Sequence, residues 1–334
     1  MRTAAVLVVA LAACGSSSPA LAQPVVVEAD LTGGYTSDKA GALATQVRAF
    51  GDLPLGLRVL GEAAWASRSE TDERTDAFGA AYPYGNRVQV IEAYAERLFR
   101  TGPGLVGFRA GRYRTPFGIY TRGDYAYSGF LRAPLIRYDG YFALSNSFLE
   151  HGAELIAGIP QLYVETSLSA PADVGDSVRR SGVDSVTRLQ GYYGPWIVGV
   201  SHIRTQPYMP QEFAHGRSVF TGVDLRWTAG GVQVSGEWLT GRPFDGTSTT
   251  GWHADVMVHR PVMGPVTAVW RSEQLDYDAS APFARWARRH TAGARVRLLR
   301  NLSAQVNVLH QSGDLTDAYR NALDGALTYS IRLR

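Results

Sequence analysis

Strict alternation of apolar and polar side chains is the feature that most constrains what this chain can fold into. The stretch VFTGVDLRW places Val223, Leu225 and Trp227 on one face, with Asp224 and Arg226 on the other. The same pattern recurs in GVQVSGEWLTG, GWHADVMVH and LTYSIRLR. Successive side chains of a strand point to opposite faces, so a period of two over eight or more residues predicts β-strands and not helices.

Each of these predicted strands has one apolar and one polar face, and aromatic residues recur near the strand ends. This pattern is typical of a transmembrane β-barrel, whose strands face lipid outside and water inside. The alternative is a soluble β-sandwich, but sandwich strands are usually shorter. Beyond the N-terminal segment no run of eighteen apolar residues occurs, so the sequence predicts no transmembrane helix.

The alternation predicts about sixteen strands and therefore an all-β fold, a transmembrane antiparallel β-barrel. A barrel of about eight strands is filled by its own side chains, whereas about sixteen leave a water-filled channel. The expected strands are 25–36, 42–51, 55–68, 87–100, 104–115, 150–159, 161–170, 184–194, 196–206, 217–229, 231–242, 250–260, 263–277, 288–300, 302–312 and 325–334.

The connections between these strands alternate in length. Short turns such as DLPL, IPQ and AGG follow every second strand, and longer links lie between them. Outer-membrane barrels have short periplasmic turns and longer extracellular loops. We therefore expect both chain ends on the periplasmic side and the long links outside the cell. The longest link, residues 116–149, follows the fifth strand and is the third external loop.

The N-terminus reads as an export signal, residues 1–22, which leaves residues 23–334 as the barrel. Arg2 supplies the positive charge, AAVLVVALAA the apolar core, and the small-x-small pattern ending at Ala22 a cleavage site before Gln23. A second reading is open, because LAAC followed by GSSS resembles a lipoprotein cleavage box, in which Cys14 is lipidated. Cys14 is the sole cysteine, so the sequence predicts no disulfide and no cysteine-based metal site.

The net charge of +3 is too small to indicate a nucleic-acid partner. Lys39 is the sole lysine, so nearly all the basic charge is arginine. A GC-rich genome would explain this composition. Alternatively, the arginines serve anion binding, because their forks hold carboxylate and phosphate bidentately.

The segment RAGRYRTPFGIY, at the start of the longest link, carries a family resemblance. Together with sixteen strands and alternating connections, it resembles the Gram-negative sixteen-stranded outer-membrane porins, and among them the phosphate-selective and related substrate-specific porins. The resemblance implies that the third external loop folds into the lumen and narrows the pore. It also implies a homotrimer in outer-membrane lipid that passes small hydrophilic solutes or anions by passive diffusion, with no cofactor.

The alternation assigns charged residues to the channel. A transverse field between acidic strands four, six and seven and basic strands opposite would orient passing solutes; alternatively, these are simply solvated lumen charges. The facing of Arg112 and Arg114 is ambiguous in the pattern. The expected constriction residues on the long link are Arg122, Asp124, Arg132 and Arg137. The expected pore-lining residues are Arg58, Glu62, Glu92, Glu96, Arg109, Glu154, Glu165, Arg226, Arg271, Arg295 and Arg297.

Two other function classes are weaker readings. An outer-membrane hydrolase needs a nucleophile beside a base, and none of the seven histidines lies in a nucleophile motif. His253 and His259 are six residues apart on one strand face, about 20 Å, which is too far to share a metal. A structural or adhesive barrel would need elaborate external loops or a further domain. We therefore expect a channel with no catalytic residues and no metal.

Overall fold

The computed structural model describes most of the chain from residue 25 to residue 333. The segment 1–22, expected to be a signal peptide, and the expected constriction residues Arg122 and Asp124 lie outside the described residues. The described ranges are 25–37, 41–67, 88–119, 129–132, 134–137, 149–171, 179–180, 183–205, 208–209, 218–242, 248–259, 265–278, 285–313 and 321–333.

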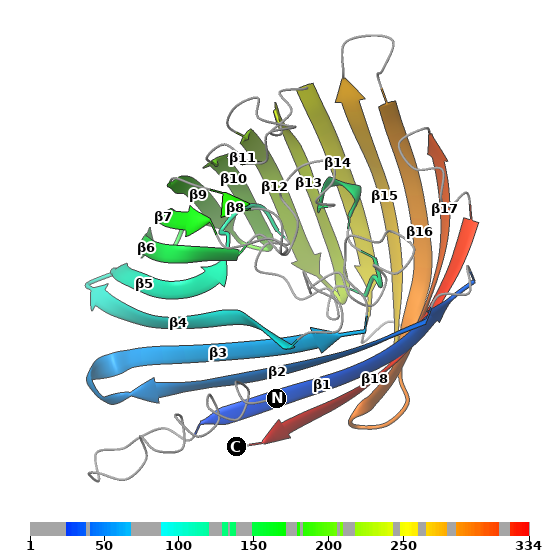
Figure 1. The fold of residues 1–334 in the computed structure, drawn as a ribbon, viewed down its shortest axis with the longest axis horizontal. Helices are drawn as coiled ribbons and strands as arrows, with labels where there is room; N and C mark the ends of the chain where they lie inside the picture. The colour runs from blue at the N-terminus through cyan, green and yellow to red at the C-terminus, as the bar shows by residue number, and fades with distance from the viewer. Residues whose placement is uncertain are drawn as a thin grey trace.

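The dominant element is a closed antiparallel barrel of sixteen strands (Figure 1). Each barrel strand pairs with the barrel strands before and after it in the chain, and the first strand, β1, closes the ring by pairing with the last, β18. The predicted fold class is thus confirmed. The barrel strands are β1 (Val26–Thr36), β2 (Gly41–Leu53), β3 (Leu57–Ala66), β4 (Val88–Thr101), β5 (Gly104–Arg114), β6 (Leu149–Ile159), β7 (Leu162–Pro171), β9 (Asp184–Tyr193), β10 (Trp196–Arg204), β12 (Val219–Ala229), β13 (Val232–Arg242), β14 (Ser248–Val258), β15 (Val266–Asp278), β16 (Arg285–Arg297), β17 (Leu302–Gly313) and β18 (Asn321–Leu333).

The elements outside the barrel are small. Two strands of two residues each, β8 (Arg179–Arg180) and β11 (Tyr208–Met209), pair across two of the long links. Two 3-10 turns, η1 (Pro54–Gly56) and η3 (Leu135–Arg137), complete the described part of the chain. No helix in that part is long and apolar enough to cross a membrane.

The two faces of the strands differ as the alternation predicts. On β12, Val223 and Leu225 are 41% and 40% exposed, whereas Asp224 between them is 1% exposed. On β13, Trp238 is 44% exposed and its neighbour Glu237 is 3% exposed. A soluble protein buries its apolar residues and exposes its charges, so this reversed arrangement is the one expected of a barrel surrounded by lipid.

Tight turns join the strands at the end of the barrel where β1 begins and β18 ends. Gly230 and Gly231, which link β12 to β13, have positive φ angles of 57° and 81°. A two-residue turn of this kind twists in the same sense as the strands, and glycine adopts it without strain. The turns hold the strands in register, and the register decides which inner-face charges meet.

Candidate functional site: the inner face of the barrel

Buried ion pairs join neighbouring strands across β2 to β5. Glu62 on β3 has a fully buried side chain, and its two carboxylate oxygens accept from Arg48 on β2 and Arg114 on β5, each at 2.7 Å. Arg114 also lies 3.8 Å from Glu92, whose carboxylate accepts from the Arg114 backbone N–H. One carboxylate between two guanidinium groups is therefore the centre of this part of the wall.

A second cluster lies on β4 to β6. Arg109 donates from Nε to Glu96 at 3.1 Å and from Nη1 to Glu154 at 2.9 Å, so one guanidinium bridges two strands. The same guanidinium lies 4.6 Å from the ring centre of Tyr94, which is cation–π distance. Arg109 and Glu96 are 11% and 9% exposed, whereas Glu154 is fully buried, so both members of the Arg109–Glu96 pair still contact solvent.

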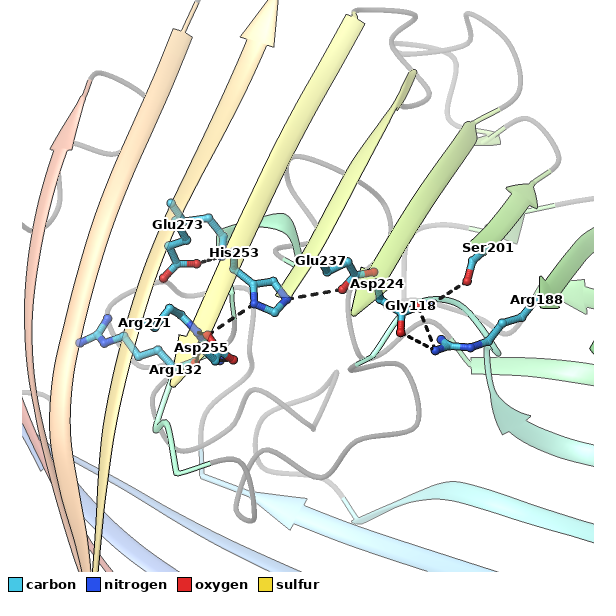
Figure 2. A network of polar contacts seen from close by, with 11 residues as sticks. Gly118, Arg132, Arg188, Ser201, Asp224, Glu237, His253, Asp255, Arg271 and Glu273 are labelled. Carbon is cyan, nitrogen blue, oxygen red and sulfur yellow. Dashed lines mark hydrogen bonds and ion pairs between the residues drawn. The ribbon is translucent and has the colours of Figure 1, made fainter. Parts of the chain in front are cut away.

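The network continues over β9 to β15, as Figure 2 shows. Arg188 on β9 donates to both oxygens of Asp224 on β12, at 3.0 and 2.9 Å. Further along, His253 is buried between two carboxylates, with Nε2 3.5 Å from Glu237 and Nδ1 3.4 Å from Asp255. Polar groups at this density would be costly in an apolar interior, and here acidic and basic groups lie next to one another.

Arginine forks complete the wall on β14 to β16. Arg271 forms a bidentate ion pair with Asp255, in which Nε and Nη2 donate to the two carboxylate oxygens at 2.7 and 2.9 Å. Arg289 donates to Glu273 at 2.6 Å. The aromatic ring of Phe130, from the long connection after β5, lies 3.9 Å from the Arg271 guanidinium carbon.

The first part of that connection packs on the inner face. Phe117 is fully buried in an apolar cluster with Val186, Ile203, Phe220 and Leu239, which come from β9, β10, β12 and β13. Next to it, the Gly118 backbone N–H donates to the Ser201 hydroxyl at 3.1 Å. The cluster explains why these four strands carry an apolar side chain on an otherwise polar face.

The second part, described at residues 129–132 and 134–137, is held by polar groups of β15, β17 and β18. Arg132 donates to both carboxylate oxygens of Asp324 at 2.7 and 2.9 Å, and its backbone carbonyl accepts from Arg271 at 3.0 Å. The backbone N–H groups of Leu131 and Leu135 donate to Asn307 and Glu273, at 2.9 and 2.6 Å. In Figure 2, Arg132 and Gly118 lie on the strand face that carries His253.

The expected site residues fall into groups. The paired ones are described above, and Arg58, which is more than half exposed, pairs with Asp52 at 3.1 Å near the short turns. Glu165 is fully buried opposite Arg188 in the strand register. Arg226 is half-buried, Arg297 is exposed, and Arg295 donates to Ser303 at 3.3 Å. Arg137 is described through its backbone in η3, and Arg122 and Asp124 lie outside the described residues.

The facing of Arg112 and Arg114 is resolved by the end of β5. Arg112 points out of the barrel and contacts His151 on β6 at 2.9 Å, whereas Arg114 points in and pairs with Glu62. Both Tyr113 and Arg114 are buried. Alternation stops here because the chain leaves the sheet and turns into the barrel.

The expected acidic wall on strands four, six and seven requires correction. It set the glutamates of these strands, Glu92, Glu96, Glu154 and Glu165, against basic strands opposite. Arg109, itself an expected pore-lining residue, lies between Glu96 and Glu154 on the same wall. The pairs Arg48–Glu62 and Arg188–Asp224 were missed, because neither arginine was assigned to the channel. The alternation of β2 and β9 contains this signal, since Arg48 and Arg188 fall on the polar face. Positive and negative charges are therefore mixed on both walls.

The fold resembles that of several solved structures. A Salmonella typhi OmpF in complex with daunomycin has 12% sequence identity and a TM-score of 0.64, covering 92% of this chain and 97% of that one. An anion-selective porin from Comamonas acidovorans has 11% identity and a TM-score of 0.64, covering 93% and 100%. The outer-membrane protein OmpT of Vibrio cholerae, in its trimer form, has 11% identity and a TM-score of 0.60, covering 92% and 98%.

No protein-family model and no curated protein matches the sequence. At identities of 11–12%, the likeness shows a shared fold and does not identify the solute of this protein. The match nevertheless extends over nearly the whole length of both chains. The chain therefore has the sixteen-stranded barrel fold of the outer-membrane porins.

Proposed function

We propose that the protein is a porin of the Gram-negative outer membrane, which forms a water-filled channel for passive diffusion of small hydrophilic solutes. One observation carries the proposal: a closed sixteen-strand barrel with an exposed apolar exterior and an inner face of ion pairs. A barrel of this size encloses more space than its own side chains fill. The full-length likeness to porins supports the same function.

The channel leans towards anions. Within the described residues, Arg226 and Arg297 form no salt bridge with a carboxylate, whereas the inner-face carboxylates Glu62, Glu154 and Asp324 are all paired with arginine. Cationic groups without an ion-pair partner in a narrow wet pore favour anions. The likeness to an anion-selective porin points in the same direction.

The pore-lining and constriction roles are part of this proposal. The long connection would narrow the channel, with Arg122, Asp124 and Arg137 as its constriction residues. Arg132 has a different role in the proposal, because Asp324 holds its guanidinium against the wall. The contacts of residues 117–118 and 131–135 with β9 to β18 support the lumenal course of this connection.

Export and assembly complete the proposal. The segment 1–22 would be a signal peptide cleaved after Ala22, and mass spectrometry of the exported protein would show Gln23 as the first residue. The mature barrel would form a homotrimer in outer-membrane lipid, for which the trimer form of the Vibrio cholerae protein is the structural analogy.

Conductance tests the function directly. The refolded barrel should form ion-conducting channels of uniform size in a planar lipid bilayer, and its reversal potential in a salt gradient should show anion preference. A correctly folded barrel is recognised by its altered gel migration without boiling, because a closed ladder of hydrogen bonds resists detergent. A folded barrel that does not conduct would overturn the channel function.

A further inference from the structure

The outer surface of the barrel is chemically different at its two ends. Arginine and histidine side chains that point outward gather at the end of the long links, far from the chain termini. Outward residues at the opposite end are mainly apolar and exposed, for example Leu53, Ile159, Leu162 and Leu333. The outward cationic and histidine residues near the long links are Arg112, His151, His202, Arg204, Arg242, Arg288, His290 and His310.

Arg97 is the exception among the outward arginines of the described strands, since it lies towards the short turns. Its guanidinium carbon is 4.6 Å from the ring centre of Phe99 and is thus occupied by a cation–π contact. The asymmetry between the two ends is therefore a property of several strands and not of one residue.

Within this set, Arg204 and Arg242 lie side by side on the barrel exterior. Arg204 ends β10, Arg242 ends β13, and both are register partners of Val219 on β12 between them. Two strand spacings separate the two backbones by about 10 Å. The inward residues next to them, Ile203 and Gly241, confirm that both arginines point outward, because Ile203 is fully buried in the inner apolar cluster.

The guanidinium groups of Arg204 and Arg242 are both available to bind a ligand. Each arginine is exposed, and within the described part of the chain neither forms a hydrogen bond or an ion pair. This differs from Arg288, on the same rim, which donates to Gln274 at 2.8 Å. Two exposed arginine side chains whose backbones lie about 10 Å apart can both reach one phosphate group between them, which accepts guanidinium groups bidentately.

The position of Arg204 and Arg242 along the membrane normal indicates which part of the lipid they contact. Trp238 points outward on β13 four residues before Arg242 and is 44% exposed. Outward aromatic residues mark the boundary between hydrocarbon and headgroups. Four residues along a strand tilted by about 40° add about 10 Å of height, so Arg242 and Arg204 lie at headgroup level.

We propose that Arg204 and Arg242 form a clamp for the phosphate group of a phosphorylated lipid headgroup in the outer leaflet. The inference rests on the proposed outer-membrane location and adds a specific lipid contact to it. The lipid is favoured over a free phosphate ion because both arginines point away from the channel and sit above the aromatic boundary. Their position on the rim of the long links requires the leaflet that faces out of the cell.

The test compares lipid retention by native mass spectrometry of the detergent-refolded barrel, with diphosphorylated lipid A as the added probe. Removing both charges in R204Q/R242Q should lower retention by roughly thirtyfold, the combined effect of two basic residues at a lipid surface. Lipid A stripped of phosphate should bind the wild type as weakly as this variant. R204K/R242K, which keeps the charges but loses the forks, should give an intermediate retention.

R58Q/R297Q is the matched control, because it also removes two arginines but from the lumenal face. Its lipid retention should stay within about twofold of wild type. Equal loss in both double variants would reduce the effect to net charge and overturn the clamp, as would undiminished retention in R204Q/R242Q. Displacement of the lipid by millimolar inorganic phosphate alone would identify a free-anion site instead.

The same preparations distinguish this inference from the proposed function. Conductance of the wild-type barrel in a planar bilayer tests the channel, and lipid retention tests the clamp. A conducting barrel without lipid A specificity would refute the clamp alone, and a non-conducting barrel that retains lipid A would refute the channel alone. Unboiled gel migration verifies that every variant is folded.

Discussion

The two sides of the inner face use charge for different purposes. On the wall of β2 to β7, carboxylates pair with arginines of adjacent strands, as in the Glu96–Arg109–Glu154 bridge. On the wall of β9 to β18, which we call the loop-bearing wall, polar groups also hold the long connection, as Asp324 holds Arg132. Arg48 and Arg109 on the first wall are still 27% and 11% exposed, whereas Arg132 and Arg271 are 5% and 1% exposed. Arg114, at the end of β5 where the connection begins, is 4% exposed and resembles the second group.

The difference in exposure between the two walls indicates which charges can act on a solute. A charge sealed under the connection stabilises the connection, and its field is largely cancelled by its partner. A charge that still contacts water in the lumen can act on passing ions. Position on the polar face is thus necessary for a role in selectivity but not sufficient.

The largest effect is expected when part of the long connection after β5 is deleted. Deleting residues 124–137 should raise single-channel conductance by roughly twofold or more, since the narrowest section would widen. Ion selectivity should weaken in parallel. The measurement is conductance and reversal potential in a planar bilayer.

The control is a deletion of equal length, residues 71–84, in the link after β3. That link is expected outside the channel, so its loss should leave conductance near the wild-type value. Equal changes in the two folded variants would contradict the constriction role of the long connection.

Next in size is the buried pair that anchors the connection. Asp324→Asn leaves the Arg132 guanidinium buried without its counter-charge, which should destabilise the barrel by about 3–5 kcal/mol. Urea unfolding in lipid vesicles, followed by tryptophan fluorescence, measures the free energy. The channel should also become noisier, because the segment around Arg132 loses its attachment.

Glu154→Gln is the corresponding change on the opposite wall. Arg109 keeps Glu96 as a partner, so this variant should lose clearly less stability than Asp324→Asn and should leave current noise unchanged. If the two substitutions proved equivalent in stability and in noise, the two walls would not differ in the way described here.

Somewhat smaller is the effect of the apolar anchor. Phe117→Ala leaves a cavity among Val186, Ile203, Phe220 and Leu239, and should cost about 3 kcal/mol, at the low end for buried phenylalanine. The low end is expected because an anchor at the end of a connection can partly collapse into the space. Urea unfolding measures the loss.

Phe99→Ala tests whether burial causes that cost. Phe99 is 40% exposed on the outer face, so truncation there leaves no internal cavity and should cost less than Phe117→Ala. A larger loss at Phe99 would show that lipid contact, and not the inner cluster, dominates the stability of the barrel.

The sequence predicted the strands well because their signal is local. Alternation within β12 to β14 identifies both the strand and its outer face without knowledge of any partner. Alternation alone does not reveal a break in the period, such as the one at β4, where the pairing with β3 shifts at Glu62 and brings both Ile91 and Glu92 to the inner side. Strands of two residues, such as β8 and β11, carry no period at all.

The site was less predictable because its contacts depend on register. Arg109 and Glu154 each fall on the polar face, but their pairing requires that β5 and β6 align them directly, which no single strand encodes. The Arg132–Asp324 pair spans 192 positions in the chain. No local pattern in the sequence could assign Arg132 to the wall in place of the open channel.

The smallest expected effect comes from a single exposed lumenal arginine. Arg297 lies at the end of β16 near the short turns, is exposed, and forms no ion pair within the described residues. Arg297→Gln should therefore leave stability unchanged within about 0.5 kcal/mol. It should lower the anion-to-cation permeability ratio at 0.1 M salt by less than roughly twofold, because the Debye length there is about 10 Å and one charge among several acts at that range.

At 1 M salt the Debye length falls to about 3 Å, and the difference from wild type should vanish. Reversal potentials at the two concentrations give the ratio. A shift that persists undiminished at 1 M would mean that Arg297 contacts the ion directly, and that the section near the short turns, and not the long connection, is the narrowest part of the pore.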